Sequence, residues 1–154
     1  MNDKINYCLS ETHKHVRKVQ QNINLFIKDL MYRGEHHDNS KFEEPELSIF
    51  AENTHKLSQT KYGSDEYKLL LHEVKPAIDN HYSKNRHHPE HWPNGVEDMT
   101  LVDLIEMLSD WKAATERNKD GNIRKSIEIN SSKYNISPQL RTVFENTVRE
   151  YFKE

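Results

Sequence analysis

Apolar residues recur every three or four positions along most of the chain, which is the spacing of amphipathic helices. The first such stretch runs from Lys4 to Arg33 and contains neither glycine nor proline. Its apolar positions are Ile5, Cys8, Val16, Val19, Ile23, Phe26 and Leu30. The pattern predicts one long helix that turns this stripe inward and ends at Gly34.

Helix-start signals divide the next part of the chain. Ser40 with Glu43 has the spacing of a capping box, and Pro45 suits a first helical turn, so we expect a second helix to begin there. The run Gly63-Ser64-Asp65 predicts a break and the cap of a third helix. His81 is expected near the end of that helix, one turn past its last apolar position.

The second half of the chain continues in the same way. Residues 84–98 contain two prolines and a glycine and are predicted to form a long ordered loop, which is usually functional in a small domain. Helix starts are predicted at Thr100 with Asp103, near Ile123, and at Ser137-Pro138. No stretch shows strand-like alternation. The sequence therefore predicts an all-α protein of about six helices in a single domain over residues 1–154.

Composition narrows the class of protein. The length of 154 residues suits one domain with a real core, and the net charge of −3 leaves no broad basic surface for nucleic acid. A single cysteine, Cys8, excludes an internal disulfide and a thiolate zinc site. No signal peptide and no membrane-spanning apolar run are expected, so we predict a cytoplasmic protein, in the host cytoplasm if it is phage-encoded.

Histidine is the residue type that points to chemistry. Six of the ten histidines form two clusters, namely His36-His37-Asp38 and the set His81, His87, His88 and His91. Imidazole is the commonest protein ligand for divalent transition metals. A His-Asp pair offers a nitrogen and an oxygen to one ion if the backbone bends there. The alternative is a purely structural role, in which the pair lies at a solvated helix end with Asp38 or Ser40 as the cap.

Three carboxylates share one face of the fourth predicted helix. Asp103, Glu106 and Asp110 are spaced three and four residues apart, so their like charges repel unless a cation lies among them. We assign Asp103 to the cap of Thr100. We expect Glu106 and Asp110 to be partly buried, because apolar residues flank them.

The loop histidines suggest a site for an anion. Arg86, His87 and His91 would donate to phosphate oxygens, and Lys41 would join them. Trp92 either stacks on a base or anchors the loop to the core, and we favour the anchor. At least one of the loop histidines is expected to have a purely structural hydrogen bond.

Several sequence blocks resemble a family of small phage and bacterial proteins that is catalogued as a domain of unknown function (DUF5662). The blocks are His15-Val16-Arg17-Lys18-Val19, His37-Asp38-Asn39-Ser40-Lys41-Phe42, Asn85 to Trp92, and Glu106 to Ala114. The order of a His, a His-Asp pair and a distant Asp is also similar to the metal ligands of the HD superfamily of metal-dependent phosphohydrolases.

That resemblance implies an HD-like helical domain and a set of ligands. His15, His37, Asp38 and Asp110 would hold the metal. His15 is preferred to His13 because it lies nearer the apolar stripe.

A second ion would take further histidines, with His81 first and His88 or His91 beside it. Asp38 would orient the attacking water, and Glu106 or His88 would act as general acid or base.

The predicted function is a metal-dependent phosphohydrolase. A divalent ion (Mn²⁺, Fe²⁺, Co²⁺, Ni²⁺ or Zn²⁺) would activate a water for attack on a nucleotide or another small phosphate ester. One alternative is a non-catalytic protein that sequesters a metal or a nucleotide on the same scaffold. Another is a helical interaction protein whose histidines are structural or respond to pH. A homo-oligomer is compatible with the apolar residues Val143, Val148 and Tyr151 of the last helix.

Overall fold

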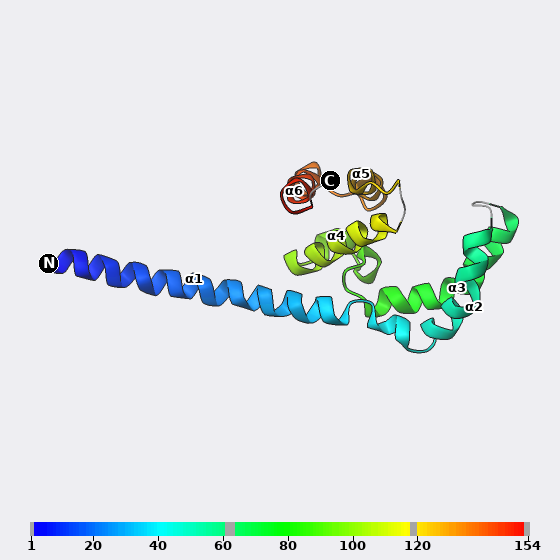
Figure 1. The fold of residues 1–154 in the computed structure, drawn as a ribbon, viewed down its shortest axis with the longest axis horizontal. Helices are drawn as coiled ribbons and strands as arrows, with labels where there is room; N and C mark the ends of the chain where they lie inside the picture. The colour runs from blue at the N-terminus through cyan, green and yellow to red at the C-terminus, as the bar shows by residue number, and fades with distance from the viewer. Residues whose placement is uncertain (1, 61–63, 118–119, 153–154) are drawn as a thin grey trace. The chain divides into compact units, whose positions relative to one another are not determined.

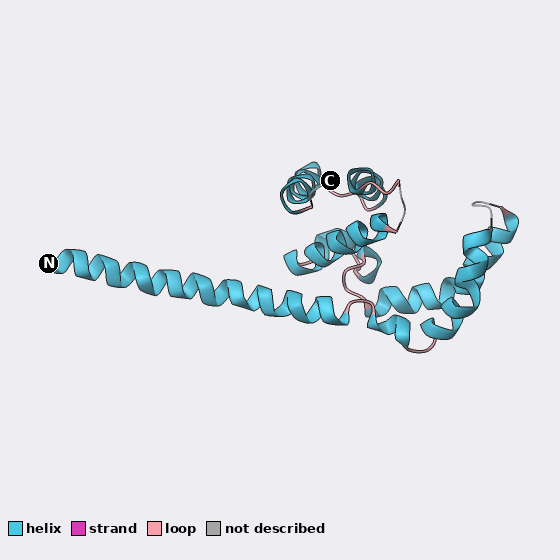
Figure 2. Ribbon diagram, viewed as in Figure 1, coloured by secondary structure: helices cyan, strands magenta, loops and turns pink. Residues whose placement is uncertain are grey.

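The structure is a computed structural model that describes residues 2–60, 64–117 and 120–152. Every regular element in these ranges is a helix (Figure 2). The all-α prediction is therefore confirmed. None of the described helices combines the length and the apolar character needed to cross a membrane.

The chain separates into two compact units, Met1–His36 and His37–Glu154. The first unit is the helix α1, Asp3–His36, which runs without a break (Figure 1). It continues two residues beyond Gly34, where it was predicted to end, and nothing lies within 4 Å of the place a Cβ would take at that glycine. None of its residues is buried, so the predicted stripe is amphipathic in sequence but is not core in this unit.

The second unit contains five α-helices and three short 3₁₀ helices within its described residues. In chain order they are η1 (Asn39–Phe42), α2 (Glu46–Gln59), α3 (Asp65–Lys84), η2 (Pro89–His91), η3 (Gly95–Asp98), α4 (Leu101–Glu116), α5 (Ile123–Lys133) and α6 (Pro138–Tyr151). Helix α2 packs along α3, and α5 packs against both α4 and α6 (Figure 1).

Side-chain caps begin most of the helices where the sequence predicted them. Ser64 accepts from the backbone N–H of Tyr67 at 3.1 Å, and Ser137 caps α6 with Pro138 in the first turn. Thr100 and Asp103 form a reciprocal capping box at α4. The predicted box of Ser40 and Glu43 is wrong, because those residues lie in and just after η1 and α2 starts only at Glu46.

The core of the second unit lies between α4, α5 and α6. Its buried members are Leu104, Met107, Leu108, Trp111, Ile123, Ile127, Ile136, Phe144 and Val148. The Trp111 ring meets the Phe144 ring edge-on, with the ring centres 6.0 Å apart. This contact fixes the C-terminal half of α4 against α6, and α4 carries two of the carboxylates discussed below.

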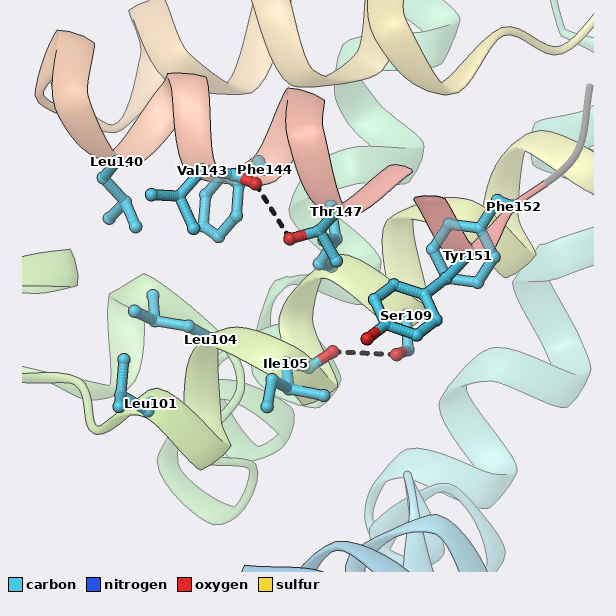
Figure 3. Close-up of a pocket in the computed structure, with 11 residues that line it drawn as sticks. Leu101, Leu104, Ile105, Ser109, Leu140, Val143, Phe144, Thr147, Tyr151 and Phe152 are labelled. Carbon is cyan, nitrogen blue, oxygen red and sulfur yellow. Dashed lines mark hydrogen bonds between the residues drawn. The ribbon is translucent and has the colours of Figure 1, made fainter. Parts of the chain in front are cut away.

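A groove of about 490 Å³ with mostly apolar walls runs between α4 and α6 (Figure 3). Leu104 and Phe144 form its floor, while Val143 and Tyr151 stand at its rim and are 50% and 76% exposed. Of the three apolar residues that the sequence left open on the last helix, only Val148 belongs to the core.

Candidate metal centre

The His37-Asp38 pair lies in a tight turn between α1 and η1, at the start of the second unit. Asp38 has φ 56° and ψ 21°, a left-handed conformation that aspartate tolerates better than most residues. This is the backbone bend that the pair needs. His37 Nε2 lies 3.6 Å from Asp38 Oδ2, so both side chains face the same space.

Three more histidines reach this space from other segments. His81 comes from the last turn of α3 and is 5% exposed, and His87 comes from the following loop and is 1% exposed. Their Nε2 atoms lie 3.3 and 3.4 Å from Asp38 Oδ1. His88 Nε2 lies 2.8 Å from His81 Nε2. The fold thus brings the imidazole nitrogens of three histidines close to the Asp38 carboxylate, although these histidines lie up to fifty positions from Asp38 in the chain.

Helix α4 supplies the remaining carboxylates. Asp110 Oδ1 lies 3.6 Å from His37 Nε2. One turn earlier, Glu106 Oε1 lies 2.9 Å from His37 Nδ1 and 3.1 Å from His87 Nδ1. The i, i+4 spacing on one helix face therefore places both carboxylates at the cluster, as the sequence predicted.

Two overlapping sets of side chains bring their donor atoms within 4.8 Å of one another. The first set is Asp38, His81, His87 and His88, and the second is His37, His87 and Asp110. Together they supply four imidazoles and two carboxylates. Donors of these types fit Mn²⁺, Fe²⁺, Co²⁺, Ni²⁺ or Zn²⁺, as one ion or as two, and His87 is the residue that the two sets share.

The buried atoms at the centre of the cluster lack hydrogen-bond partners. Asp38 Oδ1 and His87 Nε2 are both inaccessible to solvent and make no hydrogen bond. Burying an unpaired polar atom costs roughly 1–3 kcal/mol, so native proteins seldom leave two side by side. A cation between these atoms would satisfy both, and the cluster therefore fits the metal that the sequence predicted.

The outer nitrogens of the same histidines are held by carboxylates. His81 Nδ1 lies 2.9 Å from Glu46 Oε2, and Glu46 is fully buried. The Glu106 carboxylate likewise contacts the Nδ1 atoms of His37 and His87. An N–H donated outward from Nδ1 leaves the lone pair on Nε2 facing inward, which is the arrangement typical of metal-bound histidine.

The electrostatics show how the ion-free site distributes its protons. Interactions with the Asp110 and Glu106 carboxylates raise the pKa of His37 to about 10, although burial opposes the shift. Burial lowers the pKa of His81, and burial together with the neighbouring His87 and His81 lowers the pKa of His88 to about 4. At neutral pH, His37 therefore carries a proton that an ion has to displace, whereas His81 and His88 are already neutral.

Both aspartates are ionised despite their surroundings. Burial alone would raise the pKa of Asp38, but the hydrogen bond and the charge of Lys41 outweigh it and lower that pKa. Burial of Asp110 is outweighed in the same way by its interaction with His37 and by the charge of His87, so its pKa is lowered as well. Both carboxylates are thus available as anionic ligands at neutral pH.

His15 is not brought to this cluster. It is exposed on α1, 21 residues before His36, and a rise of 1.5 Å per residue puts about 32 Å of helix between them. The helix continues through Gly34 to His36, and no residue of α1 from Asp3 to His36, His13 included, belongs to the two sets of donors. His87, predicted to bind substrate, has the geometry of a ligand instead.

Other predicted site residues have structural partners. Arg86 donates from Nε and Nη2 to buried Asp103 at 3.1 and 3.2 Å, and its guanidinium lies over the Trp92 ring. His91 Nδ1 donates to the backbone oxygen of Tyr82 at 2.9 Å. Arg86 and Trp92 therefore anchor the loop, and substrate binding by Arg86 and His91 stays a prediction.

Three further residues that the sequence assigned to the site, Lys41, His88 and Glu106, do lie at the cluster. The contacts of His88 and Glu106 differ from the roles predicted for them. Lys41 Nζ lies 2.6 Å from Asp38 Oδ2, and its side chain is 41% exposed, so it stands at the rim. His88, predicted as a general acid or base, belongs to the first set of donors. Glu106, predicted in the same role, orients two imidazoles.

Sequence reasoning missed Glu46. It stands at the first turn of α2, next to Pro45, where a glutamate is ordinarily a solvated residue near a helix N-terminus. In the structure it also accepts from Asn80 Nδ2 at 2.8 Å. An acidic residue 35 positions before a histidine carries no periodic signal, so only the fold reveals the pair.

The class that the fold and the site define is an all-α protein with a cluster of histidine and aspartate side chains that could hold a metal ion. The sequence pattern of a family of unknown function (DUF5662) matches residues 4–150, and the chain belongs to that family. No curated protein and no solved structure matches the chain.

Proposed function

We propose that this protein is a divalent-metal-dependent phosphohydrolase that acts on a nucleotide or another small phosphate ester. The observation that carries the proposal is the cluster of six imidazole and carboxylate donors around two buried, unpartnered atoms, Asp38 Oδ1 and His87 Nε2. Imidazole and carboxylate donors of these types are typical of hydrolytic metal centres. The His-Asp pair and the distant Asp110 keep their places in the HD-like ligand order, but His15 is not among the donors, and His87, which follows the pair in the chain, departs from that order.

The residues around the cluster would divide the work. His81, His87 and His88 would hold the ion with Asp38 on one side, and His37 and Asp110 would hold it on the other. When bound, the ion would supply a nucleophilic water and stabilise the charge on the phosphoryl group. Glu46 and Glu106 would keep the imidazoles in the tautomer that points Nε2 inward.

Lys41 is the residue best placed to meet an anionic substrate. Its ammonium group lies beside Asp38 and is partly exposed, so it would pair with a phosphate oxygen as the substrate arrives. A surface depression of about 740 Å³ adjoins it and is lined by Leu47, Phe50, Thr54 and His55. That volume and the Phe50 ring suit the organic part of a nucleotide-sized substrate.

The second candidate is a protein that holds a metal without turnover. One observation favours it, since Glu106 is engaged by the Nδ1 atoms of His37 and His87 and is thus committed to orienting them. In that case the cluster would sequester an ion or a metal–nucleotide complex.

The test combines metal analysis with turnover. Purified protein is stripped with a chelator, reloaded separately with Mn²⁺, Co²⁺ and Zn²⁺, and assayed for phosphate release from a panel of nucleotides. Asp38→Asn should lose metal and turnover together, whereas the exposed control Asp79→Asn on α3 should keep both.

Turnover retained by Asp38→Asn would contradict the proposal. Metal binding without phosphate release from any member of the panel would favour the second candidate.

A further inference from the structure

The apolar stripe of α1 follows a seven-residue repeat. One position of the repeat is Leu9, Val16, Ile23 and Leu30, and the other is Ile5, Thr12, Val19 and Phe26. The two positions alternate at spacings of four and three over four repeats, which is the a/d pattern of a coiled coil. A helix that packs against a globular core needs no such strict repeat.

This stripe is exposed from Ile5 to Phe26. Ile5, Leu9, Val16, Ile23 and Phe26 are each between 48% and 54% exposed, and Val19 is 41% exposed. A contiguous apolar surface of this length is unusual for a monomer in water and marks an interaction site. The feature is independent of the metal centre, whose donors all lie in the second unit.

We propose that α1 pairs with α1 of a second copy of this chain, in antiparallel orientation. The stripe is self-complementary: if residue i faces residue 35 − i of the second copy, every a position meets a d position. Leu9 then faces Phe26, Val16 faces Val19, and Ile5 faces Leu30, and each pair occurs twice. Thr12, the one polar residue among these eight positions, is matched with Ile23.

The orientation follows from the next repeat position. Arg33 continues the d series, and a parallel pair would face the two arginines with each other at the core of the seam. In the antiparallel pair Arg33 faces Asn2, and its ion pair with Asp29 at 3.3 Å is kept. The antiparallel pair therefore avoids contact between the two arginines and keeps every apolar layer of the seam.

The first test is the mass of the protein in solution. Light scattering should give twice the 18.3 kDa of one chain. The double variant Val16→Gln/Ile23→Gln should weaken the dimer by about 100- to 1,000-fold, because it removes four half-exposed apolar side chains from the seam. Glutamine is at least as good a helix former as valine or isoleucine, so circular dichroism should show α1 intact.

Leu25→Gln is the matched control. Leu25 is 69% exposed and lies outside the stripe, so this variant should remain dimeric. Zinc binding should be the same in all three proteins. A wild-type protein that is monomeric at every accessible concentration would overturn the proposal.

If the protein is monomeric and the double variant unfolds at a lower temperature than Leu25→Gln, the stripe packs within its own chain. That outcome would also overturn the proposal.

Cys8, which is the chain's single cysteine and is exposed, reports the orientation directly. Spin labels on Cys8 should be separated by about 28 Å along the axis of an antiparallel pair, since Cys8 faces residue 27. A parallel pair would put both labels at the same level, about one interhelical distance of 8–10 Å apart before the label arms are added. If pulsed electron–electron double resonance gives the short distance of the parallel pair, the antiparallel arrangement is refuted.

Discussion

Replacing Glu46 with glutamine tests whether the histidines are held for an ion. The carboxylate is fully buried, and its two oxygens accept from His81 Nδ1 at 2.9 Å and from Asn80 Nδ2 at 2.8 Å. Glutamine keeps the shape of the side chain but removes the negative charge, and its amide oxygen can satisfy only one of the two donors well. His81 then loses the partner that fixes its tautomer.

The expected effect is a loss of metal affinity. Removal of a carboxylate that orients a metal-bound histidine typically costs 10- to 100-fold in affinity, which corresponds to about 1.4–2.7 kcal/mol. Because burial lowers the pKa of His81, this imidazole is neutral with or without an ion at neutral pH. Proton competition at His81 therefore does not mask the effect.

The assay is a competition titration of Zn²⁺ against a chromophoric chelator at pH 7. Glu52→Gln, an exposed change on the same helix α2, is the control and should bind as the wild type does. The ion-free thermal midpoints of Glu46→Gln and the wild type are compared in parallel, so that a loss of folding is recognised. If Glu46→Gln binds Zn²⁺ within twofold of Glu52→Gln, the assigned role of Glu46 is refuted.

Four further outcomes are expected. Calorimetry in buffers of different ionisation enthalpy should show that Zn²⁺ binding at pH 7 releases about one proton. This proton comes from His37, whose pKa is about 10, and none comes from His81 or His88, whose pKa values are lowered. A titration without proton release would contradict the role of His37 as a ligand. A free ion concentration of 100 times the dissociation constant should stabilise the fold by about 2.7 kcal/mol and raise the thermal midpoint by roughly 5–10 °C, and Asp38→Asn should abolish the shift. Without an ion, the folded pKa of His37 is above its unfolded value, so its contribution is complete below about pH 6.5 and should fade as the pH rises through about 10 in urea titrations. Ile127→Ala should cost about 2–5 kcal/mol in the free energy of unfolding, because Ile127 is fully buried in the α4–α6 core, and a cost below 1 kcal/mol would show that the core is misplaced.

The parts of the fold that local chemistry determines could be predicted from the sequence. Ser64, Thr100 and Ser137 cap helices where their spacing predicted, since a cap depends only on the next few residues. The helical repeat also predicted that Glu106 and Asp110 lie on the same face of their helix and reach the same site. Asp103 was correctly assigned to the cap and also pairs with Arg86.

The parts that depend on tertiary arrangement could not be predicted. Glu46 meets His81 only because α2 packs along α3, and neither helix shows this in its own pattern. His15 was selected from an amphipathic stripe, but periodicity does not say what a stripe faces. His87 was assigned to substrate because it lies in a loop, whereas the loop folds it inward until it is buried.

The most direct test of the metal centre is anomalous diffraction from crystals grown with Zn²⁺ or Mn²⁺, recorded at the absorption edge of the metal. We expect a peak bounded by Asp38 Oδ1 and by the Nε2 atoms of His81 and His87, with His37 and Asp110 on its other side. The same data collected from Asp38→Asn should lack it. A metal-loaded crystal whose only anomalous peaks lie elsewhere on the surface would contradict the assignment.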